Sequence, residues 1–164
     1  MDTPHLRAAT RDDLEAINDI YNVYVRCSTC TFQVEPEPLT GRVAWFDAHG
    51  PEYPVIVAES AGQMVGWGAL SRFHARAAYR HTVENSVYVR QDLHHRGIGR
   101  ALLADLVAKA AALRHHSIMA LIAADQTPSI KLHESMGFVE VAHLKEVGFK
   151  FSRWLDVVYL QLML

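Results

Sequence analysis

The sequence predicts one α/β (α+β) domain over residues 1–164, with a mixed central sheet of about seven strands and helices on both faces. Three observations lead to this prediction. Two apolar segments flank a short glycine turn in the first half of the chain, which is typical of an antiparallel hairpin. A strand, a glycine turn and an amphipathic helix follow one another at the centre. After them, strands alternate with helices.

The N-terminal part is predicted to contain one short strand and two helices. The strand covers residues 5–8, and Thr10 is a candidate helix cap because acidic residues follow it at once. Apolar residues then recur at three- and four-residue steps over 14–24. Two prolines interrupt the chain before a second helix over residues 39–48.

The remaining segments form the rest of the sheet. Residues 55–59 and 64–71 flank Ala61-Gly62 and predict a hairpin. The other predicted elements are strands over 81–89, 117–123, 139–147 and 154–162, and a short helix over 128–135 that ends before Gly137.

The most informative stretch, residues 84–103, reads as strand, turn and helix. Val87 and Val89 alternate with polar or aromatic residues, as in a strand with two distinct faces. A helix begins close to Gly97, because apolar residues then recur at helical spacing: Leu102, Leu103, Leu106, Val107, Ala110 and Leu113.

The turn Arg96-Gly97-Ile98-Gly99 is a candidate seat for a pyrophosphate. Glycines let the backbone approach a bulky ligand, and the unpaired amides of a first helical turn bind anions. The turn matches neither the dinucleotide-binding pattern nor the nucleotide-triphosphate loop. An ordinary strand-to-helix turn is the alternative interpretation.

Composition excludes several classes of protein. A net charge of −2 and a pI near 6.5 argue against a nucleic-acid partner. No apolar run reaches the roughly 20 residues of a membrane span, and the N-terminus lacks a signal core, so we expect a cytoplasmic protein with no membrane partner. Cys27 and Cys30 are interpreted as reduced thiols. The ten histidines lack a recognisable ligand pattern, so no metal is expected.

Several motifs in the same order resemble a known family. His94-x-x-Gly97-x-Gly99 is similar to the coenzyme A pyrophosphate loop of the GNAT acetyltransferase superfamily. Residues 82–89, 129–134, 137–138 and 150–158 resemble the phosphinothricin and methionine sulfoximine N-acetyltransferase family within it. The resemblance covers nearly the whole chain. It implies the GNAT fold, with a sheet splayed beside its central strand, acetyl-CoA as co-substrate, and a homodimer.

The resemblance also implies where the coenzyme binds. The expected residues are Val87, Tyr88, Val89, His94, His95, Arg96, Gly97, Ile98, Gly99, Arg100, Gln126 and Ser129. Two positions depart from the family pattern. His94 stands where glutamine or arginine usually begins the loop, and Gln126 stands where an asparagine usually bonds the pantetheine arm.

Acetyl transfer to an amine requires a base, a donor for the developing oxyanion and a proton for the leaving thiolate. Glu84 lies on a strand rich in apolar and hydroxyl residues, which raises a carboxyl pKa toward that of a useful base. His133 occupies the position where the family has a catalytic histidine, and a main-chain amide near Val87–Val89 is the candidate oxyanion donor. The alternatives are a solvated glutamate and a surface histidine.

The acceptor site is expected on a basic loop. No acid lies among the basic residues between two strands, which are Arg72, His74, Arg76, Arg80 and His81, and arginine binds carboxylates or phosphinates well. The segment Ala75-Arg76-Ala77-Ala78-Tyr79 resembles a family segment that contributes to the acceptor site, which adds Tyr79. Phe32 resembles a substrate-wall residue of the family, although it is equally suitable as a core residue. A solvated loop is the alternative for the basic residues. Arg153, Trp154 and Asp156 are interpreted as structural, near a dimer contact or sheet edge.

The predicted function is therefore N-acetylation. The acetyl group of acetyl-CoA passes to the primary amine of a small amino-acid-like acceptor, such as phosphinothricin or methionine sulfoximine, by direct attack in a ternary complex. Two alternatives stay open. One is a coenzyme-binding regulatory module with little turnover, and the other is acetylation of protein N-termini or polyamines.

Overall fold

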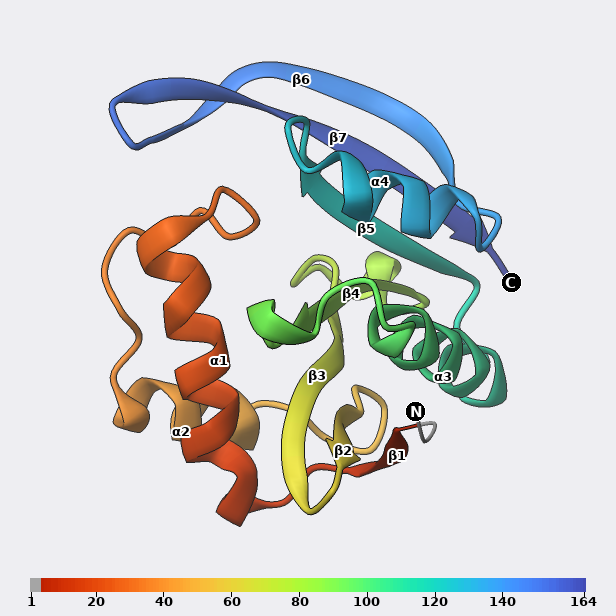
Figure 1. Ribbon diagram of the computed structural model, residues 1–164. Helices are drawn as coiled ribbons and strands as arrows, with labels where there is room; N and C mark the ends of the chain where they lie inside the picture. The colour runs from red at the N-terminus through yellow and green to blue at the C-terminus, as the bar shows by residue number, and fades with distance from the viewer. Residues whose placement is uncertain (1–3) are drawn as a thin grey trace.

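The computed structural model describes residues 4–164 and contains one seven-stranded mixed sheet, as predicted (Figure 1). The strand order is β1-β2-β3-β4-β5-β7-β6. The strands are β1 (His5–Ala8), β2 (Val55–Ser60), β3 (Gln63–Arg72), β4 (Thr82–Val89), β5 (Ser117–Ala123), β6 (Val139–Lys150) and β7 (Arg153–Met163). The α-helices are α1 (Leu14–Cys27), α2 (Leu39–Asp47), α3 (Ile98–Ala112) and α4 (Thr127–Glu134).

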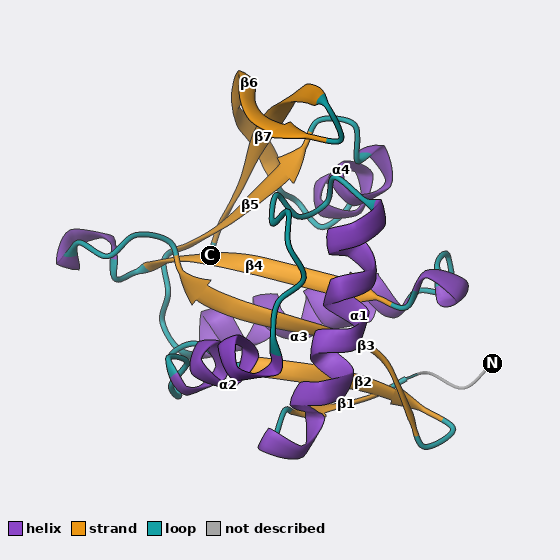
Figure 2. Cartoon of the chain, turned by 90° about the vertical axis from the view of Figure 1, so that its left-hand side faces the viewer, coloured by secondary structure: helices purple, strands orange, loops and turns teal. Residues whose placement is uncertain are grey.

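The helices cover both faces of the sheet, which confirms the prediction (Figures 1 and 2). α1 and α2 pack on one face, where Leu14 and Ile17 meet the buried Trp67 of β3. α3 and α4 pack on the other face, where Leu102 and Leu106 lie in the larger core. Each fully buried leucine contributes about 1.5–3 kcal/mol relative to an exposed one. Two separate cores therefore hold the sheet between them.

The sheet is splayed at its centre. β4 and β5 are its only parallel neighbours among the described strands. Their pairing covers Thr82↔Ser117, Val83↔Ile118 and Glu84↔Met119 and then ends, although both strands continue. Beyond this point the facing backbone edges of β4 and β5 have separated. The splay implied by the family resemblance is present.

The last hairpin is longer than the sequence predicted. β6 and β7 extend to a two-residue turn at Phe151 and Ser152, with φ of 52° and 58°. The predicted hairpin at Ala61-Gly62 has the same left-handed pair of residues, with φ of 50° and 73°. Glycine marks that turn in the sequence, whereas no glycine or asparagine marks the turn between β6 and β7. The predicted strands over 139–147 and 154–162 were therefore too short.

The tip of the β6–β7 hairpin is fixed to the segment that follows α1. Lys150 is 4% exposed, and its Nζ donates to the main-chain oxygens of Ser28 and Thr31, both at 2.7 Å. Gly148 lies against Phe32, since a Cβ at this glycine would be 2.2 Å from the phenylalanine ring. The hairpin consequently holds the segment carrying Phe32 in place.

Candidate active site

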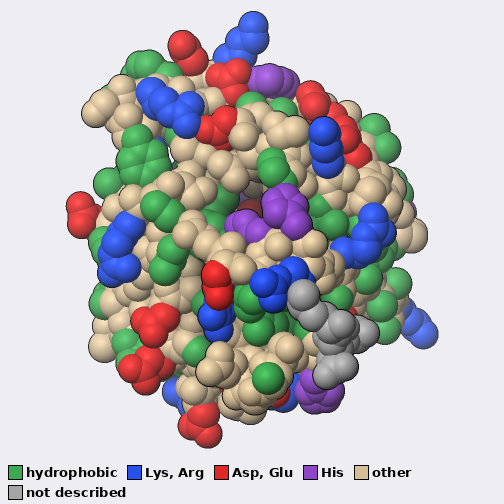
Figure 3. Space-filling model, in the orientation of Figure 1, with side chains coloured by type: hydrophobic (Ala, Val, Ile, Leu, Met, Phe, Trp, Pro, Cys, Tyr) green, Lys and Arg blue, Asp and Glu red, His purple; other side chains and the backbone are tan. Residues whose placement is uncertain are grey.

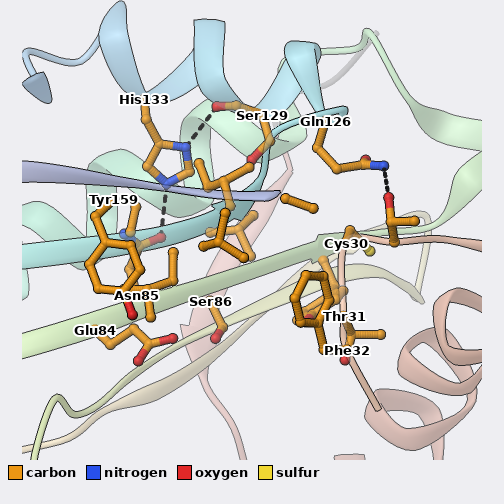
Figure 4. Close-up of a pocket in the computed structure, with 18 of the residues that line it drawn as sticks. Cys30, Thr31, Phe32, Glu84, Asn85, Ser86, Gln126, Ser129, His133 and Tyr159 are labelled. Atoms are coloured by element: carbon orange, nitrogen blue, oxygen red, sulfur yellow. Dashed lines mark hydrogen bonds between the residues drawn. The ribbon is translucent and has the colours of Figure 1, made fainter. Parts of the chain in front are cut away.

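A cavity of about 440 Å³ lies where β4 and β5 separate (Figure 4). Its walls also include the segment after α1, the start of α4 and the β6–β7 hairpin. The lining residues are Thr29, Cys30, Thr31, Phe32, Glu84, Asn85, Ser86, Val87, Tyr88, Ala120, Leu121, Ile122, Ala123, Gln126, Ser129, His133, Leu144, Val147, Val157 and Tyr159. Seven predicted site residues meet here: Phe32, Glu84, Val87, Tyr88, Gln126, Ser129 and His133.

Alternate amides of β4 point into this gap, and the amide of Val87 is one of them. The N–H of Arg90 donates to the carbonyl of Val65, at the end of the β3–β4 pair (2.9 Å). Because N–H groups along a strand alternate between its two edges, the amide of Tyr88 also points to β3. The amide of Val87 therefore points away from β3, toward the unpaired edge of β5. This is the position in which a donor could stabilise a developing oxyanion.

Glu84 has an unengaged carboxylate in a partly buried position. It makes no hydrogen bond or salt bridge with any other residue of the described chain. Burial raises its pKa from the ordinary value of 4.5. A carboxylate with a raised pKa and open lone pairs suits a general base, because it accepts a proton readily near neutral pH.

His133 is 4% exposed, and both of its ring nitrogens are engaged (Figure 4). Nδ1 lies 2.8 Å from the main-chain oxygen of Ser129, which can only accept a hydrogen bond. Nε2 lies 3.0 Å from Oδ1 of Asn85, whose amide nitrogen donates to the Met119 carbonyl at 3.3 Å. Burial lowers the pKa of His133, whereas the hydrogen bond to Ser129 raises it. Both ring nitrogens thus face oxygen atoms of the protein, and a neutral imidazole donates to only one of the two.

Asn85 is the residue of this group that the sequence analysis did not select. It is buried, and it connects His133 to β5 through the Met119 carbonyl. The sequence could have indicated Asn85, because it directly follows Glu84 on the central strand. An asparagine interrupts the apolar pattern of a central strand, where a buried amide requires partners.

The glycine turn before α3 has the geometry expected of an anion site. Gly97 caps the helix with φ of 80°, and a Cβ there would meet nothing within 4 Å. The first bond of the helical ladder joins the amide of Ala101 to the carbonyl of Gly97 at 3.0 Å. The amides of Ile98, Gly99 and Arg100 precede it and have no acceptor within the helix. Three donors at a positive helix end suit a phosphate group.

The residues before this turn lie on the surface. His94, His95 and Arg96 are exposed, and histidine side chains gather beside a hollow over this part of the molecule (Figure 3). Nε2 of His94 lies 2.6 Å from the hydroxyl of Tyr24, which also donates to the carbonyl of Val89. His94 is thereby positioned by α1.

Gln126 is also tied to the segment after α1. Its Nε2 donates to the hydroxyl of Thr29 at 2.7 Å, and that hydroxyl donates to Asp125 at 2.6 Å. The amide lines the cavity next to Ser129. Its position is therefore compatible with the predicted contact to the coenzyme arm.

The predicted acceptor loop lies outside the cavity wall. Arg72, His74, Arg76 and Tyr79 are exposed, and none of them lines the cavity. Tyr79 packs its ring on His74, with centroids 4.7 Å apart. Phe32, by contrast, is part of the wall. The structure brings the predicted catalytic and coenzyme residues together more closely than the predicted acceptor residues.

Residues 4–164 contain neither a membrane-spanning helix nor a recognisable metal-binding cluster. No helix of residues 4–164 is both long and apolar enough to cross a membrane. The same part of the chain contains no group of three or more histidine, cysteine, aspartate or glutamate side chains that could hold a metal ion. Cys27 and Cys30 are free thiols.

Known proteins are similar to this chain in sequence and in fold. The chain matches the acetyltransferase (GNAT) domain family over residues 6–159. It is 38% identical to the L-amino acid N-acyltransferase MnaT of Escherichia coli, with 97% of this chain and 93% of that protein covered. It is 36% identical to the L-methionine sulfoximine/L-methionine sulfone acetyltransferase of Salmonella typhimurium, with 97% and 94% covered.

A solved structure is also similar to this chain in fold and in sequence. The crystal structure of a GNAT superfamily phosphinothricin acetyltransferase from Sinorhizobium meliloti, in complex with acetyl-CoA, has a TM-score of 0.96. The two chains are 35% identical, and the match covers 99% of this chain and 89% of that one.

The splayed sheet and the glycine turn are thus those of an acyl-transferring enzyme that uses coenzyme A. The chain belongs to the GNAT acetyltransferase family. It is an acetyl-CoA-dependent N-acetyltransferase, and the family resemblance stated from its motifs is confirmed.

Proposed function

We propose that this enzyme acetylates the α-amine of a small amino-acid-like acceptor, of the phosphinothricin or methionine sulfoximine type, by direct attack in a ternary complex. The observation that supports this most strongly is the cavity of about 440 Å³ beside the unengaged Glu84 carboxylate, which has the size of a small-molecule site. Relatives at 36–38% identity act on amino acids or on methionine sulfoximine, according to their names.

The residues present fit coenzyme A. The amides of Ile98, Gly99 and Arg100 suit its pyrophosphate, and the open edge of β4 with Gln126 suits its amide-bearing arm. Bound acetyl-CoA supplies the activated acetyl thioester. His95, Arg96 and Ser129 complete the proposed binding set with Tyr88, Val89, His94 and Gly97.

In the proposed mechanism, Glu84 removes a proton from the acceptor ammonium and so exposes the lone pair that attacks. The amide of Val87 stabilises the oxygen on which negative charge develops. The C–S bond of the thioester then breaks, coenzyme A leaves as its thiolate, and the second proton that the attacking amine loses neutralises this thiolate. His133 was predicted as a second catalytic residue. Since both of its nitrogens are engaged, we propose that it positions Asn85 and the adjacent strand instead of transferring a proton.

The test is a transfer assay. The protein is incubated with acetyl-CoA and a panel containing L-amino acids, methionine sulfone, methionine sulfoximine, phosphinothricin, spermidine and a peptide N-terminus, and thiol release is followed. We expect release with the small amino-acid analogues. Faster release with spermidine or the peptide would replace the proposed acceptor class, and no release despite acetyl-CoA binding would favour a regulatory module.

His133→Gln distinguishes positioning from proton transfer. We expect kcat to fall by no more than about tenfold and the acid limb of the pH profile to stay in place, because a general acid or base typically contributes 10²–10⁴-fold. The measurement is kcat against pH for both proteins. A loss of about 10²-fold or more together with a missing limb would assign the proton to His133.

We further propose that the protein is a cytoplasmic homodimer that forms one domain over residues 1–164. The support for the dimer is an apolar surface on the β6–β7 hairpin, which lies at an open edge of the sheet. Its members are Val139, Val141, Val147, Phe149 and Trp154, each more than half exposed. The free thiols of Cys27 and Cys30 suit a reducing compartment.

Trp154→Glu tests the dimer. The side chain is 61% exposed and packs on Phe149, with ring centroids 5.0 Å apart. A charge there should convert the dimer into a monomer in light scattering. Val34→Glu, also at a 61% exposed apolar position but after α1, is the matched control and should leave the mass unchanged. A monomeric wild-type protein would contradict the proposal.

A further inference from the structure

A second, smaller cavity lies beside the first on the face covered by α1 and α2. Its volume is about 220 Å³, and Ser86 and Tyr88 line both cavities. We call it the Arg42 chamber; its other walls are Tyr21, Gln33, Glu37, Gly41, Arg42, Trp45 and Trp67. No predicted catalytic or acceptor residue lies in it.

Arg42 is a buried cation that makes no salt bridge with any residue of the described chain. Arg42 is 4% exposed. Its guanidinium carbon lies 4.5, 4.7 and 5.5 Å from the ring centroids of Tyr21, Trp45 and Trp67, respectively. Within residues 4–164 its side chain makes one hydrogen bond, from Nε to Oδ1 of Asn18 at 3.2 Å, and no salt bridge. A guanidinium has five N–H donors, so the terminal nitrogens keep theirs available.

Trp67, a residue of the chamber wall, has an unsatisfied donor that is closed off from the chamber space. Nε1 of Trp67 is buried and has no hydrogen-bond partner in the described residues. Glu37 also lines the chamber and favours the charge of Arg42, but it makes no salt bridge with it; its carboxylate accepts from Nε2 of Gln33 at 2.8 Å. The aromatic rings stabilise the charge by cation–π contacts, but they accept none of these hydrogen bonds in the plane of the guanidinium. The terminal nitrogens of Arg42 have no hydrogen-bond acceptor in the described chain and are open to the chamber, which favours a ligand that brings oxygen atoms.

The chamber is joined to the proposed acceptor position through β4. Glu84, Ser86 and Tyr88 alternate along the strand and so lie on one face of it. Ser86 lies between the carboxylate that receives the acceptor's proton and the chamber that contains Arg42. An acceptor whose amine lies at Glu84 therefore has, on the other side of Ser86, a polar recess that contains the guanidinium of Arg42 as well as the carboxylate of Glu37.

We propose that the Arg42 chamber receives an oxygen-bearing polar group of the acceptor. This inference rests on the proposed function. The group is either the carboxylate of the amino acid or the oxygens of its side-chain end, as in a sulfone or phosphinate. Both chemistries offer acceptors that a planar guanidinium binds through two N–H groups. The chamber thereby determines which small amines are acetylated, while Glu84 serves all of them.

Kinetics with three acceptors separate the two sources of oxygen. Methionine sulfone has both groups, methionine lacks the side-chain oxygens, and methionine sulfone amide lacks the carboxylate charge. We expect Arg42→Gln to raise KM for methionine sulfone by about 10–100-fold. If the side-chain oxygens occupy the chamber, KM for methionine changes less than about twofold; if the carboxylate does, KM for the amide is the one left unchanged. Equal effects on all three acceptors would overturn the proposal.

A binding experiment keeps the test independent of turnover. Trp45 and Trp67 line the chamber, and Trp154 is the third tryptophan of the chain. In Trp154→Phe, fluorescence therefore reports the chamber. We expect methionine sulfone to change the emission in this background and not when Arg42→Gln is added. The acetyl-CoA thermal shift should be equal in both proteins, which shows that Arg42→Gln still folds.

The outcomes of the two proposals are distinguishable. If methionine sulfone changes the fluorescence but no acceptor is acetylated, the proposed function is wrong and the chamber is still a binding site for oxygen-bearing ligands. If acetyl transfer occurs but methionine sulfone does not change the fluorescence, the proposal for the chamber is wrong and the proposed function still holds. If Arg42→Gln fails to fold, Arg42→Lys, which keeps the charge but not the planar fork, takes its place with the same expectations.

Discussion

Glu84→Gln is expected to lower kcat/KM for acetyl transfer by about 10²–10⁴-fold, because glutamine cannot accept the proton of the acceptor ammonium. The side chain keeps its size and position, so acetyl-CoA should still bind with the same thermal shift. The measurement is kcat/KM across pH. The wild type should gain activity as pH rises through the raised pKa of Glu84, and the variant should lack this limb.

Glu84→Gln should also be more stable than the wild type at neutral pH. The pKa of Glu84 is raised in the folded state, so the unfolded chain releases the proton first as pH rises. Below the ordinary value of 4.5 both states are protonated and the two proteins should melt alike. The stability advantage of Glu84→Gln over the wild type appears as pH rises above that value. Glu15→Gln, an exposed carboxyl on α1, is the control, and an equal gain there would contradict the argument.

Gly97→Trp is expected to weaken coenzyme A binding by about 10²-fold or more, measured by calorimetry. Gly97 has φ of 80°, and the space where a side chain would lie is open. An indole there would cover the amides of Ile98 and Gly99 that are proposed to bind the pyrophosphate.

Gly62→Trp is the matched control for this variant. Gly62 has φ of 73° and equally open space, but it lies in the turn between β2 and β3. Both substitutions carry the strain of a left-handed residue, about 1 kcal/mol. Only the change at Gly97 should reduce coenzyme affinity. Equal losses would show that strain, and not the anion site, is responsible.

Periodic segments and marked turns made most of the fold predictable. The strand at Ser117–Ala123 and the start of α3 beside Gly97 agree with the structure because apolar spacing and a glycine define them. The end of β6 was not predictable, since Phe151 and Ser152 adopt left-handed conformations without a glycine signal. Local sequence contains no information on the contact of Lys150 with a segment more than 100 residues away.

The candidate site was predictable where a motif carried it. Glu84, Gly97 and Ser129 belong to local patterns that the family shares. Arg42 was missed because its significance depends on three aromatic rings from α1, α2 and β3, which only folding brings together. Arginine on a helix with mixed neighbours otherwise indicates a solvated side chain.

The short pairing of β4 with β5 makes the middle of the sheet its weakest seam. Beyond Glu84 and Met119 the two strands no longer pair, so the peptide groups on their facing edges lack a strand partner there. An extended ligand with amides of its own occupies such a seam as an added strand would, bonding to the exposed backbone. Binding of the co-substrate is therefore expected to strengthen the connection between the parts of the molecule carried by β4 and β5, which pair with each other at only three residue positions.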